Sequence, residues 1–121
     1  MTERVFRKRV LLVEDDPGAR ESIKLLLRID RHLVVEAANG HDALELLLTQ
    51  RFDLVILDYF MPEMRGNELA LSIRQIAPSL PLMMVSAYLE KLSAGDMPVD
   101  AVLGKPFAIA DLRQAIARLI C

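Results

Sequence analysis

The chain has 121 residues, of which 53% are hydrophobic and 26% are charged, which fits one globular domain with a real core. Its formal net charge of −2 excludes the broad basic surface of a protein that binds nucleic acid directly. No apolar stretch approaches the roughly 20 residues of a membrane span, and the polar start has no signal-peptide core. We expect a cytoplasmic protein with no membrane partner, folded as one domain over residues 1–121, with residues 1–8 as a polar lead-in.

Strand-like and helix-like segments alternate along the chain. Mainly apolar segments predict strands at residues 10–13, 33–38, 54–57, 82–85 and 101–103, and the unbroken apolar run at 10–13 is typical of a strand buried on both faces. Asp16 followed by Pro17 predicts the start of the first helix. Apolar residues at helical spacing predict helices that contain residues 19–27, 43–48, 69–76 and 109–120. Residues 88–98 contain Gly95 and Pro98, which limit any helix there to about two turns.

Strands that alternate with helices predict a parallel sheet covered on both faces. In such sheets, ligands bind beyond the carboxyl ends of the strands. The side chains at or just after those ends are Glu14, Asp15, Asp58, Ser86 and Lys105. Asp58 is the most informative of them, because it ends an apolar run and is therefore expected at the rim of the sheet.

These side chains suit phosphate chemistry that depends on a divalent cation. Glu14, Asp15 and Asp58 can supply the hard oxygen ligands that Mg²⁺ prefers, and a bound cation relieves the repulsion among them. An aspartate carboxylate can act as a nucleophile and form an aspartyl-phosphate. The Lys105 ammonium and the Ser86 hydroxyl could then contact phosphoryl oxygens.

Taken singly, these residues have ordinary explanations that remain open. Glu14 and Asp15 could simply open a loop, Ser86 could cap the following turn, and Lys105 could be a solvated lysine. His32 lies in a loop context and is predicted to be solvated. The prediction therefore depends on the constellation rather than on any one residue.

The combination resembles the receiver domains of two-component response regulators. The resemblance covers almost the whole chain from about residue 9, and its motifs are residues 10–16, 53–58 with Met61-Pro62, 85–87 and 105–107. It implies an α/β, flavodoxin-like (βα)₅ doubly wound parallel sheet with strand order 2-1-3-4-5. It also implies cytoplasmic signalling with a histidine kinase or histidine phosphotransfer protein as partner, and an output through an effector domain or partner protein that the sequence does not identify.

The same resemblance implies roles for individual residues. Asp58 would be the phosphoacceptor, and Ser86 and Lys105 would contact the phosphoryl group. Asp15 would bind Mg²⁺ directly and Glu14 mainly through water. The metal site would be completed by Asp58 and the backbone carbonyl of Phe60. Such a domain promotes only its own phosphorylation and dephosphorylation, so we do not expect an enzyme that acts on other substrates.

Two departures from the family pattern affect the expected output. Val102 occupies a position, three residues before Lys105, where receiver domains usually carry Tyr or Phe. The stretch from Ser86 to Lys105 is also shorter than is typical, which predicts a shortened fourth helix. Phe60 and Tyr88 lie two residues after Asp58 and Ser86 and are expected to flank the site.

Three other functions compete with this hypothesis. A haloacid-dehalogenase-like Mg²⁺ phosphatase would need a second acid two residues after its nucleophile, where this chain has Phe60. An FMN-binding flavodoxin would need a hydroxyl-rich phosphate loop, where this chain has Glu14, Asp15 and Asp16. A receiver that acts only as a phosphate sink would keep every residue of the acceptor site.

Overall fold

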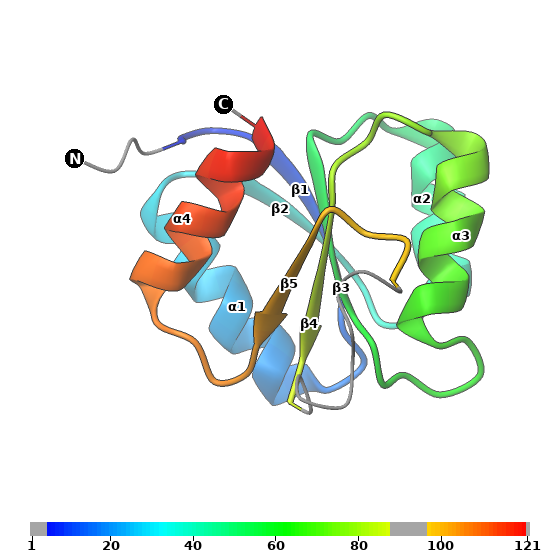
Figure 1. Cartoon of the computed structure of the whole chain (residues 1–121), viewed down its shortest axis with the longest axis horizontal. Helices are drawn as coiled ribbons and strands as arrows, with labels where there is room; N and C mark the ends of the chain where they lie inside the picture. Colours follow the sequence, from blue (N-terminus) through cyan, green and yellow to red (C-terminus); the bar gives the residue numbers. More distant parts are fainter. Residues whose placement is uncertain (1–4, 88–96, 121) are drawn as a thin grey trace.

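A computed structural model of the chain describes residues 5–87 and 97–120. Its centre is a sheet of five parallel strands in the order β2-β1-β3-β4-β5 (Figure 1). The strands are β1 (Arg9–Val13), β2 (Leu33–Ala37), β3 (Leu54–Asp58), β4 (Leu82–Ser86) and β5 (Ala101–Gly104). This order confirms the predicted flavodoxin-like topology.

Helices cover both faces of the sheet. They are α1 (Pro17–Ile29), α2 (Gly40–Thr49), α3 (Gly66–Ile76) and α4 (Ile109–Ile120). Figure 1 shows α1 and α4 on one face and α2 and α3 on the other. The described residues therefore form three layers, with the sheet in the middle.

Side-chain alternation along the strands produces two cores. Successive side chains of a strand point to opposite faces, so Leu11 and Val13 pack on the α2 and α3 side, while Val10 and Leu12 pack on the α1 and α4 side. Strand β3 divides its side chains between the two cores in the same way. This explains why β1 and β3 contain unbroken apolar runs in the sequence.

Two helix starts are fixed by side chains that directly precede the helices. The Oδ2 atom of Asp16 accepts a hydrogen bond from the backbone N–H of Ala19 at 2.8 Å, and Asn39 caps α2 through Asp42 at 2.8 Å. Each cap satisfies a backbone donor that has no partner within its helix. The predicted role of Asp16 is thereby confirmed.

The predicted strand boundaries are correct to within one residue. Strands β3 and β4 each extend one residue further than expected, so that Asp58 and Ser86 are the last residues of their strands. The predicted shortening of the fourth helix concerns residues 88–96, which lie outside the described part of the chain. Within the described ranges, no helix has the length and apolar character needed to cross a membrane.

Candidate phosphoacceptor and metal site

The register of the strands brings the predicted site residues together. Val13 is paired with Leu57, so the residues that follow them, Glu14 and Asp58, lie side by side at the carboxyl edge. The pairing of Asp58 with Val85 places Ser86 one residue beyond.

The next pair of strands brings in the lysine. Ser86 is paired with Gly104, and the backbone N–H of Lys105 donates to the Ser86 carbonyl at 2.8 Å. The Lys105–Pro106 peptide bond is cis.

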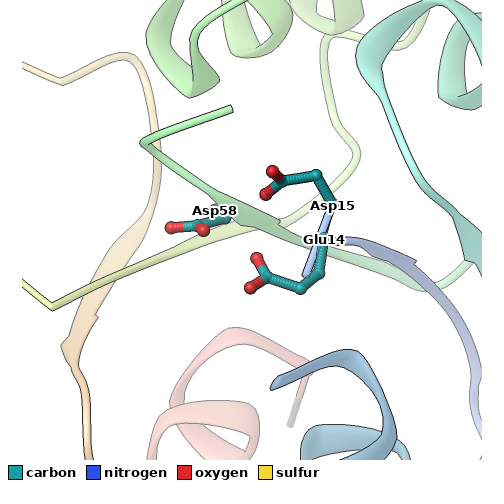
Figure 2. Close-up of side chains that lie close together, drawn as sticks. All are labelled: Glu14, Asp15 and Asp58. Atoms are coloured by element: carbon teal, nitrogen blue, oxygen red, sulfur yellow. The ribbon is translucent and has the colours of Figure 1, made fainter. Parts of the chain in front are cut away.

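Three carboxylates converge at this edge. One oxygen from each of Glu14, Asp15 and Asp58 lies within 4.8 Å of the others. Figure 2 shows the two acids that follow β1 directed toward Asp58 at the end of β3. Glu14 is 1% exposed and Asp58 is 7% exposed, so two of the three carboxylates are withdrawn from bulk water.

Lys105 is the cation that partly balances these acids. Its Nζ atom lies 3.0 Å from Oε1 of Glu14 and 3.4 Å from Oδ2 of Asp58. Among the described residues, this one ammonium does not offset all of the acids, so this part of the site keeps a net negative charge. This electrostatic imbalance favours binding of an additional cation.

The protonation of Glu14 reflects the same imbalance. The pKa of Glu14 is raised from 4.5 to about 8, chiefly because the side chain is buried; the neighbouring Asp58 also raises it, whereas Lys105 lowers it. Its Oε2 atom is buried and has no hydrogen-bond partner. A buried oxygen without a partner is costly, and a cation or a cation-bound water would satisfy it. The donor set thus fits a hard divalent cation that binds oxygen.

The remaining predicted site residues are found around these acids. Ser86 is fully buried in β4. Phe60 is 38% exposed, and its ring lies edge-on to Tyr59 with a centroid distance of 4.6 Å. The Arg65 guanidinium stands 5.4 Å from the Phe60 ring centroid. Tyr88, the other predicted flanking residue, is outside the described residues.

Val102 lies in β5, partly buried and paired with Met84. Among the described strands, β5 is the outermost one on its side of the sheet, so Val102 lies on an edge strand. The usual aromatic side chain is therefore replaced here by a short, branched one that is stiff about χ1.

Two residues at the site were not found by sequence reasoning. Arg20 donates from Nη1 to the backbone carbonyl of Glu14 at 2.8 Å. Gly66 begins α3 directly against the end of β3, where a Cβ atom would lie 2.5 Å from the Asp58 carbonyl oxygen. A signal existed for Gly66, because a glycine shortly after Asp58 can indicate a close backbone approach, whereas Arg20 resembles any surface arginine of an amphipathic helix.

The prediction for His32 was wrong. His32 is 5% exposed, and its Nδ1 atom accepts a hydrogen bond from the backbone N–H of Lys8 at 3.0 Å. The residue lies where α1 turns into β2, at the opposite edge of the sheet from the acids, and the segment before β1 covers it. The position of His32 in a loop did not show that a segment distant in the sequence would bury it.

Comparison with known proteins assigns the family. A model of the response regulator receiver domain matches residues 10–117. The chain belongs to the response regulator receiver family. Response regulator MprA of Mycolicibacterium vanbaalenii is 33% identical over 115 residues, covering 93% of this chain and 50% of the relative. This receiver chain therefore spans about half the length of such curated relatives.

Solved receiver structures have the same fold. The response regulator TrrA from Thermotoga maritima, crystallised in complex with Mg²⁺ and BeF, is 31% identical with a TM-score of 0.85, over 93% of this chain and 98% of that one. The receiver domain of a sensor histidine kinase from Pseudomonas aeruginosa, with magnesium coordinated in its active site cleft, is 26% identical with a TM-score of 0.87, over 94% and 98%. TrrA has also been crystallised with the histidine kinase ThkA; that structure is 30% identical with a TM-score of 0.85, over 94% of this chain and 99% of that chain.

Proposed function

We propose that this receiver domain accepts a phosphoryl group on Asp58 from a phosphohistidine of a histidine kinase or phosphotransfer protein. The observation that carries the proposal is the convergence of Glu14, Asp15 and Asp58 within 4.8 Å, with the Lys105 ammonium bound to two of them. The relatives that carry Mg²⁺, BeF or a bound kinase support this assignment.

The proposed reaction is an in-line phosphoryl transfer. An oxygen of Asp58 forms a bond to phosphorus, the phosphorus–nitrogen bond of the donor breaks, and its electron pair stays on the histidine nitrogen. Charge neutralisation and positioning dominate such reactions. Lys105 would neutralise one phosphoryl oxygen, and the Ser86 hydroxyl would donate a hydrogen bond to another.

The proposed metal ligands are Asp15, Asp58 and the backbone carbonyl of Phe60, with Glu14 acting mainly through water. When bound, Mg²⁺ would supply positive charge for the phosphoryl oxygens. The buried, unpaired Glu14 Oε2 supports a water-mediated contact, because such a water would satisfy that atom.

We further propose that residues 1–121 act as one signalling domain in the cytoplasm, with residues 1–8 as a lead-in and no direct contact with nucleic acid or membrane. The domain would promote only its own phosphorylation and dephosphorylation.

The competing functions have less support. A haloacid-dehalogenase-like phosphatase lacks its second acid, because Phe60 holds that position. The acidic loop of Glu14, Asp15 and Asp16 would repel the phosphate of FMN. A phosphate sink needs the same acceptor chemistry, so it differs from a signalling receiver only in lacking an output state.

Intact-mass spectrometry after incubation with acetyl phosphate and Mg²⁺ tests the acceptor. We expect one labile phosphoryl group on the parent protein and none on Asp58→Asn, because the amide cannot act as the nucleophile. Lys105→Ala should reduce the labelling, because a positive charge at the phosphoryl oxygens is lost. Asp53→Asn is the matched control, since Asp53 directly precedes β3 and lies at the opposite end of that strand from Asp58. Equal labelling of Asp58→Asn and the parent protein would refute the proposal.

A further inference from the structure

The backbone that carries the two acids after β1 is held from both sides. The N–H of Glu14 donates to the Ala37 carbonyl at 3.1 Å, which ties this turn to the end of β2. The carbonyl of Glu14 accepts from Arg20 Nη1 at 2.8 Å. This carbonyl belongs to the peptide that joins Glu14 to Asp15, so its orientation helps to set the direction of the Asp15 side chain.

Arg20 is itself fixed at a second point. Its Nε atom lies 3.3 Å from Oε1 of Glu36, which is on β2 opposite Leu12. The side chains of Arg20 and Glu36 are 22% and 34% exposed, so both are partly withdrawn from water. A planar guanidinium with several donors can bridge a carbonyl and a carboxylate, whereas a lysine offers a single ammonium at the end of a flexible stem.

Lys24 completes the surroundings of Glu36. Its Nζ atom lies 3.4 Å from Oε2 of Glu36 and 2.9 Å from Oε2 of Glu21. Glu36 therefore carries two cations from α1, one on each carboxylate oxygen. This arrangement restricts the rotation of the Glu36 carboxylate and so restricts Arg20.

We propose that Arg20 is a positioning residue for the cation site, with Glu36 as its anchor. Arg20 holds the Glu14–Asp15 peptide so that the Asp15 carboxylate is directed toward Asp58 before a cation arrives. The inference rests on the proposed Mg²⁺ site and adds two residues that do not touch the cation. It parallels other metal sites, in which groups that orient the ligands contribute to affinity.

Because Arg20 is positively charged, its removal affects Mg²⁺ affinity in opposite directions through charge and through positioning. Coulomb's law predicts that removing a positive charge near the acids would strengthen Mg²⁺ binding. Loss of positioning predicts weaker binding. Arg20→Ala therefore separates the two effects by direction, and Arg20→Lys removes the bridge while it keeps the charge.

Amide chemical-shift titration with MgCl₂ measures the dissociation constant directly and does not depend on phosphorylation. We expect Arg20→Ala to raise the Mg²⁺ dissociation constant by about tenfold, at the lower end of effects seen for groups that orient metal ligands. Arg20→Lys should show most of this loss. Adding Glu36→Gln to Arg20→Ala should cause little further loss, because Glu36 acts through Arg20. Arg28→Ala, an exposed arginine further along α1, should bind Mg²⁺ like the parent protein.

The outcomes distinguish this inference from the proposed function. A Mg²⁺ response in the parent protein that Asp15→Asn removes supports the site itself. If the site is supported, unchanged or tighter binding by Arg20→Ala overturns the role of Arg20, and full affinity in Arg20→Lys shows that charge alone is needed and overturns it as well. Arg20→Lys also decides the question if Arg20→Ala does not fold. A parent protein without any Mg²⁺ response removes both proposals.

Discussion

Burial gives Glu14 its unusual chemistry. The pKa of Glu14 is raised to about 8, which favours its protonated form as long as no cation is bound. Formation of the metal site must therefore release protons, and Mg²⁺ affinity should increase as pH rises toward that value. Asp15 is next to Glu14 in the sequence but is more exposed, so the two adjacent acids lie in different surroundings.

His32 should make folding sensitive to acid. Burial lowers the pKa of His32 below 6.5, although Asp30 opposes the shift. Below pH 6.5 the unfolded chain binds a proton that the folded chain accepts only at lower pH, so stability falls as pH decreases through this range and is fully present above it. His32→Asn keeps an acceptor near Lys8 but cannot titrate, so the variant should lose less stability than the parent protein between about pH 7.5 and 5.

Urea unfolding at several pH values measures this difference. The comparison with His32→Asn removes the contribution of Glu14, which is present in both proteins. Parallel curves of unfolding free energy against pH for the two proteins would show that His32 does not titrate in this range.

Phe60 should slow hydrolysis of the phosphorylated domain. Its ring follows Asp58 by two residues and is held near the Arg65 guanidinium, so it can limit the approach of an attacking water. Phe60→Asn should release phosphate faster after phosphorylation, and this can be measured by loss of label from purified phosphoprotein. Leu48→Asn is a control, because Leu48 is exposed on α2. A Phe60→Asn rate equal to that of the parent protein would contradict the shielding role.

At the scale of elements, the contact between β3 and α3 determines how Asp58, the proposed phosphoacceptor, is presented. The N–H of Gly66 donates to the Tyr59 carbonyl at 2.9 Å, and no side chain separates the start of α3 from the backbone of Asp58. The helix can approach this closely only because residue 66 has no Cβ atom.

Gly66→Ala should therefore destabilise the fold. The added Cβ would lie 2.5 Å from the Asp58 carbonyl oxygen and 2.8 Å from the Tyr59 Cα, and relief of such overpacking costs about 1–3 kcal/mol. Gly18→Ala is the matched control, since its Cβ would make only an ordinary contact of 3.5 Å with Asp16. Because a helix is more stable with alanine than with glycine, Gly18→Ala should raise the free energy of unfolding by about 0.5–1 kcal/mol. Denaturant unfolding measures both variants, and equal effects would contradict the packing argument.

A second contact between elements joins α1 to α4. The Arg113 guanidinium makes two hydrogen bonds to the Asp30 carboxylate, at 2.9 and 3.0 Å. Asp30 is 3% exposed and follows the last residue of α1 in the chain. The pair aligns the two helices on one face of the sheet although 83 positions separate its members.

At the scale of the whole molecule, Mg²⁺ should stabilise the fold. The cation relieves the repulsion among Glu14, Asp15 and Asp58, and a ligand at about 100 times its dissociation constant adds about 2.7 kcal/mol to the free energy of unfolding. The melting temperature should rise by several degrees, as measured by calorimetry or circular dichroism. Asp15→Asn should remove most of the rise, while the exposed Asp42→Asn variant should retain it. A melting curve that does not change with saturating Mg²⁺ would contradict the site.

The sequence determined the topology and the convergence of three acids and Lys105 at one end of the sheet. Apolar runs are long enough to identify strands, and several of them end in or lead directly to a residue with recognisable chemistry, such as Asp58 or Lys105. Parallel strands place their carboxyl ends at one edge, so the convergence of these side chains followed from their order along the chain. These predictions succeeded because they depend on local patterns and on a general rule of sheet geometry.

Only the tertiary structure decided which side chains from distant elements contact one another. The contacts of Arg20 with Glu14 and of Arg113 with Asp30, and the burial of His32, depend on how elements distant in the sequence pack against one another. A surface arginine in a helix has the same local pattern whether its side chain meets water or a backbone carbonyl. Local periodicity specifies the face of an element, whereas the partner on that face is fixed by three-dimensional packing.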